Sequence, residues 1–164
     1  MQVNSVENKP APAPIYLASY TGTQPGWHGI FNKGIRCLTK SQFSHTEVCI
    51  GHPFEGKVHC IGSSGVDGGV RAKMMQLSPD KWEVLPMPWV SEEAVWAFML
   101  EHKAAGYDLI GCGRFLLPFL LREHPAKWFC TEAVAAIAGY KEPWRFSPAD
   151  FHIIVQARLA AERG

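Results

Sequence analysis

The spacing of apolar residues changes at Pro88, and this change constrains the fold more than any other feature of the chain. Before Pro88 the chain favours strands: His45–Ile50 alternates polar and apolar side chains, and Ile15–Tyr20 is apolar and aromatic. After Pro88 the apolar residues recur at helical spacing, beginning behind Ser91. The pattern predicts an α+β domain, in which a small, mostly antiparallel sheet packs against helices.

Turn and cap residues set the expected bounds of the other elements. Further strands are expected in three short segments, the first two of them separated by a flexible Gly-rich loop at 62–69: Lys57–Ile61, Val70–Met75 and Trp82–Leu85. Helices are expected in four later segments: Ser91–Gly106, Tyr107–Leu121, Phe129–Ala138 and the stretch that begins at Ser147-Pro148-Ala149-Asp150.

The first residues of the chain differ in composition from the rest. Residues 1–14 are rich in Pro, Ala and Asn, and their prolines block both helical and ladder hydrogen bonds, which predicts a disordered tail. Residues 15–164 contain no internal repeat and are about the length of one domain. We therefore expect a tail followed by a single domain.

Composition and charge exclude several classes of function. With 16 Lys+Arg against 15 Asp+Glu, the net charge is +1, so no basic field exists for a nucleic-acid backbone. The longest strongly apolar stretch, 115–121, is interrupted by Pro118 and is shorter than the ~20 residues of a membrane span. The N-terminus lacks the pattern of a secretory signal. We expect no nucleic-acid partner, no stable membrane insertion and a cytoplasmic protein.

The cysteines do not form a recognisable framework. There are five, an odd number, and none stands in a CxxC pair, so a reducing compartment is expected rather than a disulfide scaffold. The densest cluster of metal-ligating residue types lacks zinc-site spacing: Cys49, His52, His59 and Cys60. The Gly-rich loop lacks the GK[ST] ending of a phosphate loop. The sequence predicts neither a metal nor a cofactor.

Cys130 is the candidate nucleophile, because it stands at the start of the predicted helix Phe129–Ala138. Free backbone N–H groups and the positive end of the helix dipole favour a thiolate there. A histidine beside such a cysteine lowers the thiol pKa from ~8.5 to roughly 3.5–7.5. The ordinary alternative is a buried, inert cysteine.

His45 is the candidate base. In its strand the apolar Thr46, Val48 and Ile50 suit a core face, whereas His45, Glu47 and Cys49 suit a cleft face on the other side. A carboxylate on the same side as an imidazole raises its basicity and orients its ring. The ordinary alternative is a solvated strand face.

Two further roles have candidates that the sequence leaves open. Glu47 is one candidate to orient His45; the others lie on the partner strand and its exit, namely His59, Ser63 and Ser64. Tyr20, at the end of the first strand, can offer a hydroxyl to a transition-state oxyanion, or simply pack half-buried.

The order of these motifs resembles a known family. Phe43–Val48 (FSHTEV) resembles an "SHV" strand and Trp128–Glu132 (WFCTE) a "CSE" helix start, with His preceding Cys by 85 residues. This order is similar to the circularly permuted branch of the NlpC-type papain-like superfamily, with its YiiX-like and YaeF-like bacterial proteins and, more distantly, lecithin:retinol acyltransferase-like proteins. Gly68–Arg71 followed by Lys81–Glu83 resembles small phage-encoded members.

The resemblance spans roughly residues 15–151 and implies a permuted papain-like domain with Cys130 and His45 as the catalytic pair. It departs from the family at one point: YiiX-like members are expected to carry a Glu on the strand after His, and Cys60–Ser64 contains no acid.

The resemblance also implies an activity. The implied enzyme is a thiol hydrolase, an amidase or peptidase that acts on cell-wall peptides or lipid-linked amides. A phage-encoded member would reach the cell wall after cell lysis. One alternative is an acyltransferase or lipid-ester enzyme whose acyl cleft is lined by Gly111–Leu121. Another is a catalytically inactive binding module, which the missing acid would explain.

Overall fold

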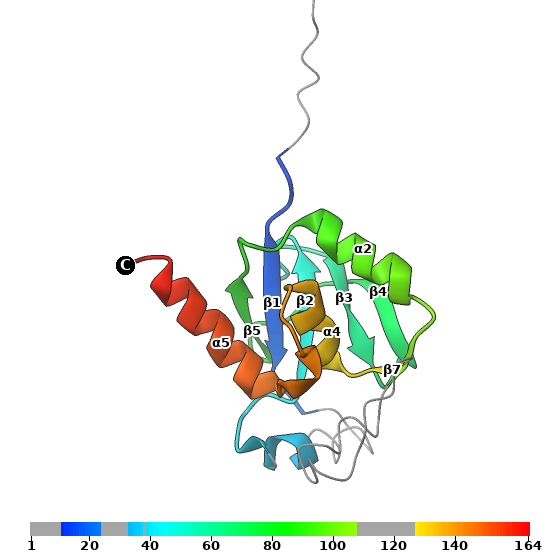
Figure 1. Ribbon diagram of the computed structural model, residues 1–164. Helices are drawn as coiled ribbons and strands as arrows, with labels where there is room; N and C mark the ends of the chain where they lie inside the picture. The colour runs from blue at the N-terminus through cyan, green and yellow to red at the C-terminus, as the bar shows by residue number, and fades with distance from the viewer. Residues whose placement is uncertain (1–10, 24–32, 38, 108–126) are drawn as a thin grey trace, which may run out of the picture.

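A computed structural model describes residues 11–23, 33–37, 39–107 and 127–164 (Figure 1). Its centre is a sheet whose strands, in the described part of the chain, follow the order β5-β1-β2-β3-β4-β6-β7. Neighbouring strands are antiparallel except β6 and β7, which are parallel. The strands are β1 (Ile15–Tyr20), β2 (His45–Ile50), β3 (Val58–Ser64), β4 (Gly69–Met75), β5 (Trp82–Pro86), β6 (Gly106–Tyr107) and β7 (Lys127–Trp128).

Helices cover one face of this sheet. The α-helix α4 (Cys130–Ile137) lies over β2 and β3, α5 (Pro148–Ala161) lies against β1, and α2 (Glu92–His102) lies against β4 (Figure 1). A short 3-10 helix, η2 (Pro143–Arg145), packs on α4. These elements confirm the α+β class. Within the described residues, no helix has the length and apolar character needed to cross a membrane.

The helices begin where the sequence places their caps. Ser91 accepts a hydrogen bond from the Ala94 N–H at 3.2 Å, and Ser147 accepts one from the Asp150 N–H at the same distance. The Asp150 carboxylate accepts the Ser147 N–H in return, which completes a capping box. Each bond satisfies a backbone group that a helix terminus otherwise leaves unpaired.

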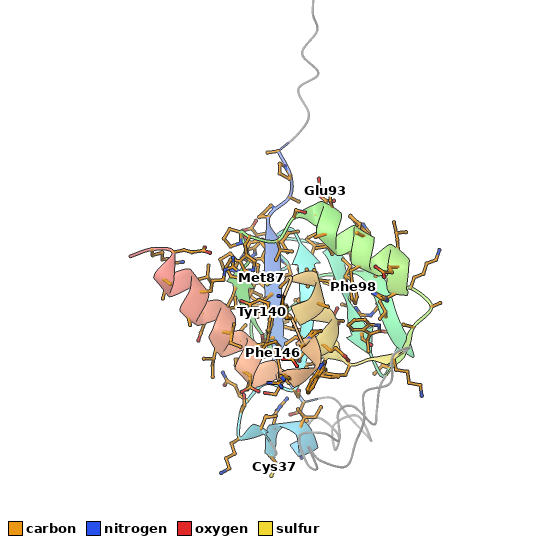
Figure 2. All side chains as sticks on the ribbon, viewed as in Figure 1. Cys37, Met87, Glu93, Phe98, Tyr140 and Phe146 are labelled. Atoms are coloured by element: carbon orange, nitrogen blue, oxygen red, sulfur yellow. The ribbon has the colours of Figure 1, made fainter. Side chains whose placement is uncertain are left out.

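The core lies between the sheet and the helices. Met87 and Phe98 are buried there, and Tyr140 and Phe146 are partly buried rings that pack against this core (Figure 2). A second, smaller cluster fills the opposite face of the sheet, where Cys49 is fully buried. The face of β2 expected to line a cleft is therefore covered over most of its length.

Two sequence expectations change in the structure. Residues 62–64 belong to β3 and Gly69 to β4, so the expected loop shrinks to a turn at 65–68. The cause is the register, which pairs Ser63 with Val70. Tyr107 lies in β6 rather than in a helix, and the rest of that expected helix falls outside the described residues.

The end of the expected tail lies in the described part of the chain. Residues 1–10 fall outside the described residues, but the Pro14 carbonyl accepts the Gly51 N–H at 2.8 Å. The last residue of the Pro-rich stretch is therefore tied to the end of β2.

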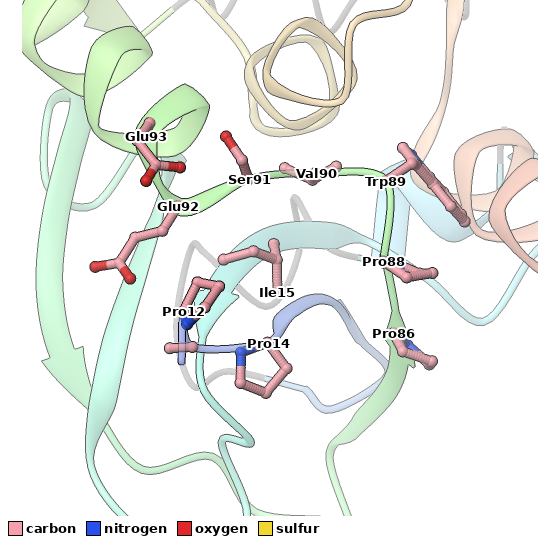
Figure 3. Close-up of a pocket in the computed structure, with 11 residues that line it drawn as sticks. Pro12, Pro14, Ile15, Pro86, Pro88, Trp89, Val90, Ser91, Glu92 and Glu93 are labelled. Carbon is pink, nitrogen blue, oxygen red and sulfur yellow. The ribbon is translucent and has the colours of Figure 1, made fainter. Parts of the chain in front are cut away.

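A cavity of about 450 Å³ lies at that same end of the sheet. Pro12, Pro14 and Ile15 line one side of it, and the connection from β5 to α2 lines the other, with Glu92 and Glu93 at its rim (Figure 3). Ile15 begins β1, whereas Tyr20, which pairs with His45, ends it. The cavity is therefore at the opposite end of β1 from the candidate base.

A buried histidine fastens α5 to the sheet. His152 is 2% exposed, and its Nδ1 lies 2.9 Å from the Ser19 hydroxyl on β1. Its Nε2 lies 3.5 Å from a Glu83 carboxylate oxygen on β5, and its ring stacks on Phe43 at 4.2 Å between centroids. Burial lowers the pKa of His152, although the charge of Glu83 opposes this effect.

This histidine should make folding stability sensitive to acid. Because folding lowers the pKa of His152, the unfolded chain binds the proton more readily, so stability falls as pH drops below ~6.5 and levels off below the folded-state pKa. His152→Gln keeps a partner for Ser19 without a titrating ring. Urea unfolding between pH 8 and 5 measures how the free energy of unfolding changes with pH. This slope, at most about 1.4 kcal/mol per pH unit, should be larger in the wild type than in the variant. Equal slopes would contradict the lowered pKa of His152.

Candidate active site

Cys130 is the first residue of α4, and the start of this helix meets the start of β2. The hydroxyl of Thr46, on β2, donates to the hydroxyl of Thr131 at 3.3 Å. Glu132, in the first helical turn, accepts the Phe129 N–H at 3.3 Å. The helix N-terminus, with its free N–H groups and partial positive charge, is thus held at the strand end that carries His45.

The Cys130 thiol is buried and surrounded by groups that favour its thiolate. Only 2% of the residue is exposed. Burial opposes ionisation of the thiol, but the charge of His45 and hydrogen bonds from His45 and the Thr46 backbone outweigh it. The Thr131 hydroxyl, 3.8 Å from Sγ, acts in the same direction. Together they lower the pKa of Cys130.

His45 stands between the thiol and a carboxylate. Its Nε2 lies 2.8 Å from Oε1 of Glu47, and the ring is also hydrogen-bonded to Cys130. Burial opposes the charged ring, but the Cys130 thiolate and the hydrogen bonds to Cys130 and Glu47 outweigh it. The pKa of His45 rises to about 10. Opposite shifts of the two groups favour a thiolate–imidazolium pair.

Glu47 is a buried carboxylate that is kept ionised. Its side chain is 1% exposed, and burial alone would raise its pKa. Arg71, on β4, donates from both terminal nitrogens to the two carboxylate oxygens. These bonds, with those from His45, lower the pKa of Glu47. A bidentate arginine–carboxylate pair of this kind combines two charge-assisted hydrogen bonds with a fixed geometry, and it is among the strong interactions of a buried carboxylate.

A glycine lies between the two residues of this pair. Gly62, on the intervening strand β3, pairs with Arg71 across the β3–β4 ladder. A Cβ at position 62 would stand 3.4 Å from Oε2 of Glu47. Because the glycine has no side chain, Glu47 and Arg71 meet across one whole strand. Beyond them, Asp67 accepts a hydrogen bond from Nε of Arg71 at 2.9 Å and lies 3.3 Å from the Lys73 ammonium.

Two aromatic rings flank the base. Tyr20 pairs with His45 in the β1–β2 ladder, and Trp82 lies 4.9 Å from Tyr20 and 6.1 Å from His45 between ring centroids. The Tyr20 hydroxyl lies over Gly22, where a Cβ would come within 2.6 Å of it. Burial raises the pKa of Tyr20. Its expected role at an oxyanion stays a prediction.

The alternatives to Glu47 have other partners. The Ser63 hydroxyl donates to the Trp128 carbonyl at 2.6 Å, so it fixes the chain two residues before Cys130 instead of orienting His45. Ser64 accepts the Asp67 N–H at 3.4 Å. His59 packs its ring on Trp96 of α2. Of the four candidates, Glu47 is the one whose side chain meets His45.

Sequence reasoning missed Arg71 and Gly62. No local pattern marks them, because their contact with Glu47 depends on the register of three strands. The cluster considered for a metal takes a different form: Cys49 and Cys60 are free thiols with Sγ atoms 3.5 Å apart. Across the described residues, no group of three or more His, Cys, Asp or Glu side chains is placed to hold a metal ion.

Comparison with known proteins adds no assignment. No protein-family model matches the chain, and neither a curated protein nor a solved structure matches it significantly. The case for a function therefore rests on the geometry of the site.

The gap at Gly62 can be tested by filling it. In Gly62→Val the new methyl groups would push Glu47 away from Arg71, so we expect a loss of about 1–3 kcal/mol in the free energy of unfolding, typical of overpacking. We also expect slower alkylation of Cys130. Gly56→Val is the control, because a Cβ at 56 meets open space. Chemical unfolding and mass-spectrometric alkylation rates measure both effects; equal behaviour of the two variants would refute the role of the gap.

Proposed function

We propose that this chain is a thiol hydrolase of the amidase or peptidase type, on a permuted papain-like fold. Cys130 is the nucleophile, His45 the general acid and base, and Glu47 the residue that orients His45. One observation carries the proposal: a single imidazole is hydrogen-bonded both to a cysteine at a helix N-terminus and to a buried, ionised glutamate. This arrangement is the one that activates a thiol for acyl transfer.

In the proposed reaction, the Cys130 thiolate attacks the carbonyl carbon of an amide or ester and forms a C–S bond. His45 then donates its proton to the leaving amine or alkoxide as the C–N or C–O bond breaks. Water attacks the resulting thioester, His45 accepts a proton from that water, and the C–S bond breaks. The acid is released, and the thiolate and imidazolium are restored.

The oxyanion of each tetrahedral intermediate would form next to the first turn of α4. Backbone N–H groups there, including that of Cys130, have no helical acceptor and point toward developing negative charge. Tyr20, which pairs with His45 from the neighbouring strand β1, remains the proposed side-chain contributor.

The substrate class follows from the family resemblance: cell-wall peptides or lipid-linked amides. The acyltransferase alternative depended on residues 111–121, which fall outside the described residues. The inactive-module alternative depended on the absence of an acid on the strand after His45. Glu47, on the same strand as His45, offers that acid from a different position, which favours the hydrolase.

The catalytic pair predicts a defined set of variant effects. Cys130→Ala should abolish hydrolysis of any accepted amide or ester, and His45→Ala should reduce kcat by at least ~10². Cys37→Ala, which removes an exposed thiol, is the matched control and should retain full activity. Screening of wall peptides, lipid amides and lipid esters supplies the substrate; turnover by Cys130→Ala would rule out the mechanism.

The same pair predicts a characteristic pH profile. The thiolate–imidazolium form exists from the lowered pKa of Cys130 up to the His45 pKa of about 10. Alkylation of Cys130 by iodoacetamide should therefore be fast at pH values where an ordinary thiol, with pKa ~8.5, is protonated. Site-resolved mass spectrometry measures the rate; a profile like that of a model thiol, unchanged in His45→Ala, would show an unactivated cysteine.

A further inference from the structure

The side chain of Arg71 is bonded on both of its edges. Its two terminal nitrogens reach both oxygens of Glu47, and its Nε donates to Asp67 at 2.9 Å. The side chain is 16% exposed, so the guanidinium is largely removed from water. A guanidinium that is held on two edges has one orientation, and it imposes that orientation on the carboxylate it grips.

Glu47 depends on this grip because it has few other partners. His45 on its own strand contacts it, Ala18 of β1 stands opposite it, and the Cys49 thiol, two residues further along β2, is close enough to feel its charge. Arg71 from β4 is the charged group that faces it across Gly62. A buried carboxylate without such a partner takes up a proton or turns toward solvent. In either case it would no longer accept the N–H of an imidazolium.

We propose that Arg71 is a positioning residue, whose guanidinium clamps both oxygens of the buried Glu47 across Gly62 and so holds the carboxylate against His45. The inference rests on the proposed function, since it assigns a purpose to the Glu47–His45 contact. Arg71 acts through Glu47, to whose carboxylate both of its terminal nitrogens donate. It adds a fourth member to the site, supplied by β4, two strands away from the strand that carries His45.

The chain offers a matched control two residues away. Lys73 lies on the same strand as Arg71, carries the same charge and also bonds to Asp67, at 3.3 Å. Its side chain is half-exposed, and its partner is Asp67 rather than Glu47. Lys73→Met therefore removes one positive charge from the same surface while leaving the clamp in place.

The experiment measures the titration of His45 by NMR, with its ring signal assigned by comparison with His45→Ala, in the full-length protein. Alkylation of Cys130 by iodoacetamide and by the anionic iodoacetate is measured in parallel. In Arg71→Met the His45 midpoint should fall by about one pH unit or more. The preference of Cys130 for iodoacetate, which reports the neighbouring positive charge, should fall with it. Lys73→Met should behave as wild type.

An Arg71→Met variant with the wild-type His45 midpoint would overturn the proposal, and so would an equal shift in Lys73→Met. If Arg71→Met does not fold, Arg71→Lys decides: it keeps a cation but loses the two-point grip, so a lowered His45 midpoint supports the clamp and a wild-type midpoint refutes it. Failure of the hydrolase itself looks different, because the wild-type Cys130 would then alkylate like an ordinary thiol.

Discussion

The buried negative charge of Glu47 is the constraint on which the rest of the site depends. A carboxylate that is 1% exposed is tolerated only with partners on its oxygens, and here a guanidinium and an imidazole supply them. Replacing such a buried pair by apolar residues is often neutral or stabilising, whereas removing one partner is costly. Glu47 and Arg71 are therefore better understood as fixing a geometry than as strengthening the fold.

That geometry extends along a single path through the sheet. The charges alternate from Asp67 to Arg71, Glu47, His45 and Cys130, and each member is bonded to the next. Each charge stabilises the opposite charge beside it, so the thiolate at one end is supported by groups on β2, on β4 and in the turn between β3 and β4. The low polarity of the second apolar cluster strengthens these interactions, because little water is present to screen them.

Local features of the fold were predictable from the sequence, and long-range ones were not. β1, β2 and the caps of α2 and α5 follow from alternation and from Ser91 and Ser147, which act within a few residues of themselves. Cys130, His45 and Glu47 could be named as candidates from the sequence because a helix start and a strand face are local patterns too. Arg71 was not found, because its partner is set by strand register. The loop expected at 62–69 was misjudged for the same reason, since glycines that look flexible in sequence are paired in the sheet.

Two of the contacts that hold Cys130, the proposed nucleophile, join distant parts of the chain. Thr131 is bonded to Thr46, 85 residues earlier, and the Trp128 carbonyl to Ser63, 65 residues earlier. Neither bond depends on the path of the chain between the two residues that it joins. A site assembled in this way is indifferent to connectivity: the strand with the base can precede or follow the helix with the nucleophile, as long as the sheet brings them together. An exchange in the order of the segments would thus leave the chemistry intact.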